Sequence, residues 1–287
     1  MKYIAVYLFF QLTINLFPMN ASGHKPLRVL SWNIYLLPVI SLFNDNQSRS
    51  KAIAAQIYES DYDLVVFQEA FSATNRRHIA RRIKDKYPYQ YGPVNQGRSL
   101  HRTNSGLWVV SRIPLQMLGS LHFEESAGFD AVARKGAVLF EGVFNGKKFQ
   151  LLSTHLQADG KVGIRERQLS EIKGKLLQPY HEKSVPQLIC GDFNIEKSDS
   201  DTYQGMLDLL EAKDGDFSSG LRYTYDETGN TLLRKPGGRK KLIDYFLLRN
   251  DELVHRIERK VRAFQRMVGD ELHHLSDHHA LEAEIHL

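Results

Sequence analysis

Cysteine is almost absent from this sequence, since Cys190 is the only one among 287 residues. A lone cysteine excludes an intramolecular disulfide and any metal site built on several thiolates. Cys190 ends an apolar run, so we interpret it as a small buried hydrophobic residue and not as a reactive thiol. Internal repeats, low-complexity tracts and Pro/Gly-rich linkers are also missing. The pattern therefore does not divide the chain into several folding units.

Long hydrophobic runs are confined to the N-terminus. Lys2 precedes an apolar run that ends at Phe17, and the small residues Ala21 and Gly23 have the spacing of a signal peptidase site. Polar residues interrupt this run, which makes it a poor transmembrane span. We expect a secretory signal peptide over residues 1–23 and a secreted or periplasmic mature protein. An uncleaved anchor and an apolar N-terminal strand are the alternatives.

The overall composition is that of an ordinary globular protein, with 42% hydrophobic and 25% charged residues. A chain of this length can bury a large core without disulfides, and we expect one catalytic domain over residues 24–287. The formal net charge is +5. A basic surface is compatible with nucleic acid, with anionic lipid, or with neither, so the charge does not choose a partner.

Short apolar runs recur along the chain, and each ends in polar residues. Runs of this length between turn-forming residues predict buried strands at 27–30, 64–67, 149–152, 188–190 and 245–248. Amphipathic spacing predicts helices at 48–58, 75–86, 165–177 and 202–210. Further strands are expected at 106–111, 136–140 and 142–150, with a hairpin turn at Asn145-Gly146. Buried strands that alternate with helices indicate an α/β fold, with sheets covered by helices.

The polar residues at the strand ends carry the chemistry. They are Asn33, Glu69, His155, Asp192, Asn194, Asp244, Asp277 and His278. Carboxylates and amides without a cysteine partner suit Mg²⁺, Mn²⁺ or Ca²⁺ better than zinc. Glu69 and Asp277 are the candidate ligands, with Asn33 close by.

His278 is the candidate general base, because an imidazole near its ordinary pKa removes a proton from water at neutral pH. Asp244 would orient that imidazole. Asp192 would align the water and Asn194 would donate to a phosphoryl oxygen, as would His155 if it is protonated. A single strand-end Asp or Asn is more often a turn former, and Asp277 alone would pass for a helix cap. The recurrence of such residues at different strand ends favours the functional interpretation.

Several blocks resemble the endonuclease/exonuclease/phosphatase superfamily and occur in its order: SWNIYLLP, DLVVFQEAF, SGLWVVSRIPL, STHLQA, CGDFNI, LIDYFLL and LSDHHALEAE. The resemblance implies a four-layer α/β/β/α sandwich of the deoxyribonuclease-like type, in which two packed mixed sheets are covered by helices. It also implies phosphoester cleavage with a divalent metal.

Other stretches resemble the bacterial neutral sphingomyelinases in particular: WNIYLLP, THLQA, RKGAVLF and IRERQLSEI. That resemblance implies hydrolysis of sphingomyelin, or a related phospholipid at a membrane surface, with release of phosphocholine. Glu69 would bind Mg²⁺ or Mn²⁺ with Asn33 adjoining. By the same resemblance, phosphate binding and general acid–base catalysis would involve His155, Asp192, Asn194, Asp277 and His278.

Two features bear on the substrate. The apolar run that continues from Asn33 through Leu37 to Phe43 suggests a lip for a lipid tail, or else a packed strand end and loop. Bacterial sphingomyelinases often carry an aromatic-tipped hairpin before the last motif, whereas residues 261–275 contain Phe264 as their only aromatic residue. This departure puts tight bilayer binding in doubt.

Three alternatives remain beside the sphingomyelinase prediction. A secreted deoxyribonuclease-like nuclease is favoured by the excess of basic over acidic residues and by the arginine-rich helix at 75–86. Another phospholipid or phosphoester phosphodiesterase of the superfamily is the second. A non-catalytic binding protein is disfavoured, because Glu69 and His278 are both present. No protein partner is expected.

Overall fold

The computed structural model describes residues 25–37, 45–96, 103–158, 163–233 and 237–287. The expected signal peptide lies outside the described residues, as does most of the apolar run after Leu37. Within the described ranges, no helix has the length and apolar character needed to span a bilayer.

Two mixed sheets form the centre of the fold. Within the described ranges, the larger sheet has the order β3-β4-β2-β1-β16-β13-β9, with β1 Leu27–Asn33, β2 Leu64–Gln68, β3 Tyr89–Tyr91, β4 Trp108–Ser111, β9 Phe217–Gly220, β13 Arg256–Arg262 and β16 Ala280–His286. The second sheet has the order β12-β8-β7-β6-β5, with β5 Leu115–His122, β6 Gly136–Phe144, β7 Lys147–His155, β8 Gln187–Asp192 and β12 Asp244–Arg249.

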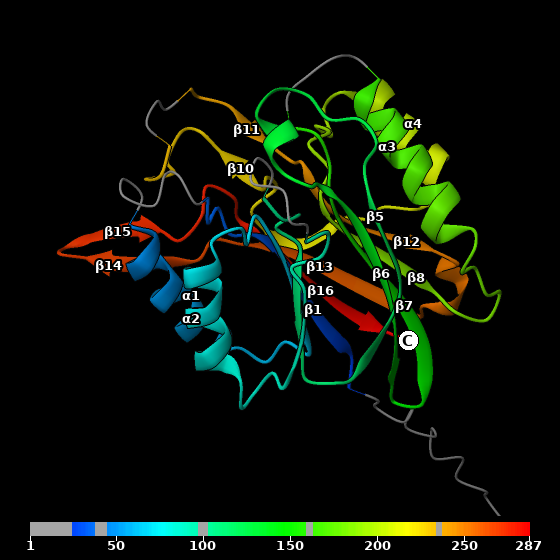
Figure 1. Ribbon diagram of the computed structural model, residues 1–287, viewed down its shortest axis with the longest axis horizontal. Coiled ribbons are helices and arrows are strands. Elements are labelled where there is room, and N and C mark those ends of the chain that lie inside the picture. The colour runs from blue at the N-terminus through cyan, green and yellow to red at the C-terminus, as the bar shows by residue number, and fades with distance from the viewer. Residues whose placement is uncertain (1–24, 38–44, 97–102, 159–162, 234–236) are drawn as a thin grey trace, which may run out of the picture.

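The helices cover the outer faces of these sheets. They are α1 Asn46–Glu59, α2 Ala73–Ile83, α3 Ile164–Ile172, which continues as a π-helical turn Lys173–Leu177, and α4 Ser200–Leu210; short 3-10 turns lie at Gly128–Val132 and Asp251–Leu253. Figure 1 shows α1 and α2 on one side of the two sheets and α3 and α4 on the other. The expected four-layer α/β/β/α sandwich is therefore confirmed.

Apolar side chains fill three layers between these elements. Val29, Val66 and Leu188 belong to the core between the sheets, where both faces of each strand are buried. A second core lies under α1 and α2, and a third under α3 and α4. Ile34 and Leu36 belong to the second core. This part of the apolar run after Asn33 is therefore packed, and it forms no lip.

The predicted elements agree with the structure except at one strand. All four predicted helices are present, and Asn145-Gly146 joins β6 to β7. The predicted break between residues 140 and 142 is wrong, because β6 runs through it unbroken. Gly142 lies opposite Phe149, and a Cβ at this glycine would lie 2.7 Å from the Phe149 ring. The glycine makes room for that ring and does not end the strand.

Two short ribbons complete the fold. One pairs β10 Tyr225–Asp226 with β11 Lys240–Lys241, and the other is the hairpin of β14 Gln265–Val268 and β15 Glu271–His274. Phe264 is buried, with its ring centroid 4.7 Å from that of Trp32, so it belongs to the core. The hairpin instead exposes the aliphatic side chains of Met267 and Leu272.

One edge of the sandwich collects the polar strand ends. The parallel strands β1 and β2 end there, as do the parallel strands β7 and β8 of the facing sheet. The antiparallel strands β16 and β12 begin there. Six strand ends from two sheets therefore surround a single position.

Candidate active site

Three of the predicted site residues form a row across the second sheet. His155 ends β7, Asp192 ends β8 and Asp244 begins β12, and the strand register places Asp192 opposite both of the others. The larger sheet contributes Asn33 at the end of β1, while Glu69 follows β2 directly. Asp277 and His278 precede β16. The structure thus brings all the predicted residues to the same edge.

Strained or glycine-dependent backbone occurs at this edge. Gly191 has φ +145°, and a Cβ there would lie 1.9 Å from the carbonyl oxygen of Thr154, so only glycine lets β8 approach β7 before Asp192. Glu69 adopts a left-handed φ of 54° although it has a side chain. Such a conformation costs about 1–3 kcal/mol and persists where its surroundings enforce it, often at functional sites.

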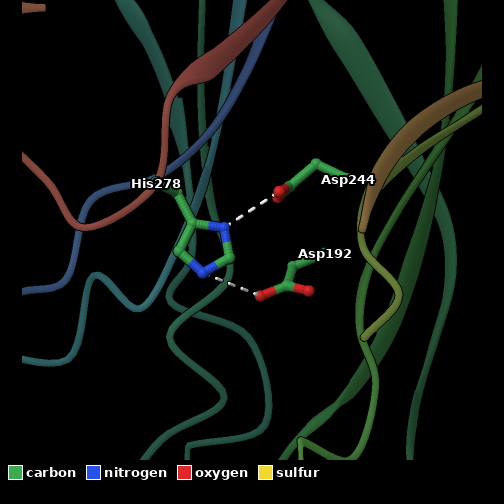
Figure 2. Close-up of side chains that lie close together, drawn as sticks. All are labelled: Asp192, Asp244 and His278. Carbon is green, nitrogen blue, oxygen red and sulfur yellow. Dashed lines mark hydrogen bonds and ion pairs between the residues drawn. The ribbon is translucent and has the colours of Figure 1, made fainter. Parts of the chain in front are cut away.

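His278 and Asp244 form the expected imidazole–carboxylate pair. His278 Nδ1 lies 2.9 Å from Asp244 Oδ2, and both side chains are buried (Figure 2). Burial by itself lowers the pKa of His278, but the carboxylates of Asp244 and Asp192 outweigh it and raise that pKa well above its ordinary value. The carboxylate therefore holds a proton on Nδ1 and orients the ring so that Nε2 faces Asp192.

Asp192 connects the two sheets. Its Oδ2 accepts a hydrogen bond from Asn33 Nδ2 at 3.1 Å and lies 3.7 Å from His278 Nε2. Its Oδ1 accepts from the backbone N–H of Asn194 at 3.0 Å. Burial and then the charge of Asp244 raise the pKa of Asp192 to about 6. The Asn194 side chain also donates to the carbonyl oxygen of Leu156 at 3.2 Å, which fixes the strand ends to each other.

Glu69 has the environment of an unneutralised carboxylate. Its Oε2 is buried and has no hydrogen-bond partner among the described residues. Burial, followed by the charge of Asp277, raises the pKa of Glu69 to about 7. Burial also raises the pKa of Asp277. Asp277 is buried, and Glu69 is half-buried with one buried, orphaned oxygen whose ionisation Asp277 opposes. This pair fits a divalent cation with oxygen ligands such as Mg²⁺.

A second arrangement for a cation exists at the same place. One ligand atom from each of Asp192, Asp244 and His278 lies within 4.8 Å of the others (Figure 2). Ligation through His278 Nδ1 would break its hydrogen bond to Asp244, and ligation through Nε2 would occupy the nitrogen that faces Asp192. Oε2 of Glu69 has no hydrogen bond among the described residues that a cation would have to break.

His155 is held in its neutral form. Burial, the ammonium group of Lys135 and the charge of His278 lower the pKa of His155 well below its ordinary value. Lys135 Nζ lies 3.0 Å from His155 Nε2, so that nitrogen accepts and Nδ1 carries the proton. The predicted role of His155 requires a protonated imidazole, which burial and the neighbouring Lys135 oppose. The fixed positive charge on this side belongs to Lys135.

Two supporting residues, both in contact with backbone carbonyls, were not among the candidate site residues drawn from the sequence. Lys135 is buried and also contacts Asp130 Oδ1 at 2.8 Å and the carbonyl oxygen of Leu156 at 3.0 Å. Arg49 is buried and donates to the carbonyl oxygens of Leu275 and Ile34, two residues before Asp277 and one after Asn33. The block RKGAVLF marked Lys135, but nothing in the sequence marked Arg49.

The charge on Glu69 should make the metal-free protein less stable at alkaline pH. We expect Glu69→Gln to stabilise it by roughly 1–3 kcal/mol at pH 8, because the raised pKa means that folding opposes ionisation. At pH 4 the carboxyl group is protonated in the folded state and largely protonated in the unfolded state, so the gain should nearly vanish. Thermal unfolding in chelator at both pH values measures this. The exposed Glu252→Gln is the control, and an equal gain from Glu69→Gln at both pH values would contradict the assignment.

The comparisons with known proteins agree with this geometry. The sequence profile of the Endonuclease/Exonuclease/phosphatase family matches residues 30–278. The chain belongs to this family. The chain is 28% identical over 234 residues to "Sphingomyelinase C 2" of Leptospira interrogans, covering 74% of this chain and 37% of that protein. It is 26% identical over 256 residues to "Sphingomyelinase C" of Listeria ivanovii, covering 80% of this chain and 76% of that protein.

Solved structures of this family share the fold. The crystal structure of beta toxin from Staphylococcus aureus matches with a TM-score of 0.79 and 24% identity, over 90% of this chain and 99% of that one. A structure of D. rerio TDP2 with a single-strand DNA product matches with a TM-score of 0.69 and 16% identity. The match covers 91% of this chain and 99% of that one. At these identities the two structures show that the fold is shared and nothing finer.

Proposed function

We propose that this protein is a divalent-metal-dependent phosphodiesterase that hydrolyses sphingomyelin to ceramide and phosphocholine by attack of an activated water. The observation that carries the chemistry is the His278–Asp244 pair at 2.9 Å, which faces a group of buried carboxylates. The same edge holds an orphaned glutamate oxygen for a cation. The lipid substrate is supported by the names of the Leptospira and Listeria relatives.

In the proposed mechanism, His278 accepts a proton from water through Nε2 while Asp244 stabilises the imidazolium ion. Asp192 lies within 3.7 Å of that nitrogen and aligns the water. The pKa of His278 is raised partly by Asp192 and Asp277. Cationic charge beside these carboxylates returns the imidazole toward its ordinary pKa, where it accepts a proton at neutral pH.

Glu69, together with Asp277 and adjoining Asn33, would hold Mg²⁺ or Mn²⁺. When bound, the ion neutralises charge on the phosphate oxygens. A crystal structure of a mutant of the Staphylococcus aureus beta toxin contains bound magnesium ions. Lys135 provides a fixed positive charge beside His155, and Asn33 keeps Asp192 in place through its amide. These residues position the phosphodiester without themselves exchanging protons.

The reaction products distinguish the proposal from the nuclease alternative. We expect purified protein with Mg²⁺ to release phosphocholine from sphingomyelin vesicles and to leave plasmid DNA largely intact, because the Leptospira and Listeria relatives are named for sphingomyelin. Phosphocholine release and plasmid nicking are measured in one buffer, with His278→Ala as the inactive control. Plasmid nicking without phosphocholine release would favour the nuclease, for which the exposed arginines of α2 are the supporting observation.

A further inference from the structure

The outer face of α2 carries a dense positive charge that the proposed active site does not use. The inner face of this helix is buried through Asn75, Ile79 and Ile83. The outer face exposes basic side chains along its length and just beyond: Arg77, His78, Arg81, Arg82 and Lys84. We call these five residues the α2 basic face. Between residues 73 and 86, Asp85 is the single acidic residue.

The guanidinium and ammonium groups of this face lack ionic partners. Among the described residues, no carboxylate lies within 4.0 Å of Arg77, Arg81, Arg82 or Lys84. Neighbouring basic residues do have partners, since Arg112 and Lys86 both lie within 4.0 Å of Asp61. The α2 basic face is therefore available to an anionic partner.

Part of this charge opposes helix formation. Arg77 lies four residues before Arg81, and like charges at this spacing destabilise a helix. Arg81 and Arg82 lie in the last turn of α2, where positive charge favours the helix dipole. The cap at Ser72 and the buried Ile79 and Ile83 stabilise the helix in addition. Arg77 therefore adds a charge that the helix itself does not need.

Helix α2, which carries the basic face, lies on the same side of the molecule as the exposed aliphatic hairpin. Ser50 of α1 donates to Asn75 near the start of α2, while Lys86 donates to the carbonyl oxygen of Tyr58 near the end of α1, so the two helices run parallel. The hairpin is attached to the start of α1 through Arg266 and Asp45, whose side chains lie 2.6 Å apart. Figure 1 shows the hairpin and both helices on one side.

We propose that the α2 basic face docks on an anionic phospholipid bilayer and holds the enzyme at the membrane. This proposal rests on the proposed lipid substrate. Arginine and lysine near an anionic leaflet are attracted to its head groups within about one Debye length. The aliphatic Met267 and Leu272 on the same side favour a lipid surface over a nucleic acid, which offers phosphates but no apolar phase. The partner is therefore a mixed surface of anionic and sphingomyelin lipids.

Vesicle binding tests the proposal directly. The combined variant Arg77→Gln, Arg81→Gln, Arg82→Gln and Lys84→Gln keeps good helix formers on α2. Wild-type protein should cosediment more strongly with phosphatidylcholine–phosphatidylserine vesicles than with phosphatidylcholine vesicles. The affinity of the variant for phosphatidylserine-containing vesicles should be lower than that of the wild type by at least about tenfold. Added salt should weaken the binding of the wild type to the same vesicles.

A matched control removes the same charge elsewhere. Lys147, Lys183, Arg256 and Lys260 are exposed outside α1, α2 and the hairpin, and their combined change to Gln should leave phosphatidylserine dependence nearly intact. Hydrolysis of a soluble phosphodiester should be unchanged in both variants. Equal losses in both, or no phosphatidylserine dependence in the wild type, would overturn the docking proposal. Cosedimentation needs no turnover, so it reports docking even if sphingomyelin proves not to be the substrate.

Discussion

Replacing His278 by alanine should lower the rate of phosphodiester hydrolysis by roughly 10²- to 10⁴-fold, the usual contribution of a positioned general base. The expectation rests on the 2.9 Å contact with Asp244, which leaves Nε2 directed into the site beside Asp192. Asp244→Asn should also slow turnover, because the amide no longer stabilises the imidazolium ion or fixes the tautomer. Steady-state hydrolysis of a soluble phosphodiester measures both effects.

The control separates chemistry from folding. His181 is an exposed histidine remote from the cluster, and His181→Ala should retain nearly the full rate. Circular dichroism and the Tm should show that His278→Ala still folds. If that variant works within a few-fold of the wild type, His278 has no part in proton transfer.

Removal of the divalent ion should reduce turnover to background, and Mg²⁺ or Mn²⁺ should restore it. The expectation follows from the orphaned Oε2 of Glu69 and from the raised pKa values of Glu69 and Asp277, which show that the site needs positive charge. Glu69→Ala should raise the metal concentration required for half-maximal rate by at least about tenfold, since loss of an outer-shell partner alone costs that much.

Asp270→Asn is the matched control for metal dependence, because Asp270 is an exposed acid in the hairpin turn. Its metal requirement should equal that of the wild type. Calorimetric titration of Mg²⁺ into chelator-treated protein gives the affinity independently of turnover. A chelated sample that keeps its full rate would exclude the metal-dependent mechanism.

Most of the site could be predicted because it consists of strand ends. A buried strand produces a recognisable apolar run, and the first polar residue after it, such as Asn33 or Asp192, must lie at the edge of a sheet. The pairing of β16 between β1 and β13 was not predictable in this way, since it joins segments far apart in the sequence. The site depends on that pairing, because it brings Asp277 and His278 to Glu69.

The supporting residues escaped prediction for a different reason. Arg49 lies on a helix and looks like an ordinary surface arginine, yet it is buried because the chain around Leu275 folds over it. Thr224 accepts hydrogen bonds from the backbone N–H groups of Ile243 and Asp244 and so fixes the start of β12. Both act on backbone groups whose positions are set by the tertiary fold, and such contacts leave no pattern in the sequence.

The hydrogen bond between Asn33 and Asp192 has a consequence for motion. The Asn33–Asp192 contact and the His278–Asp244 pair join the two sides of the sandwich at the edge that holds the site. Elsewhere the sheets meet through apolar side chains and through hydrogen bonds such as those from Arg259 to the carbonyl oxygen of Phe246 and from the backbone N–H of Leu115 to Tyr91. Turnover therefore depends on the spacing of two layers whose separation is set by side chains far from the substrate. A misplacement of about 1 Å at a reacting centre can cost about 10²-fold in rate. A slightly swollen interior would thus silence the enzyme while it remained folded.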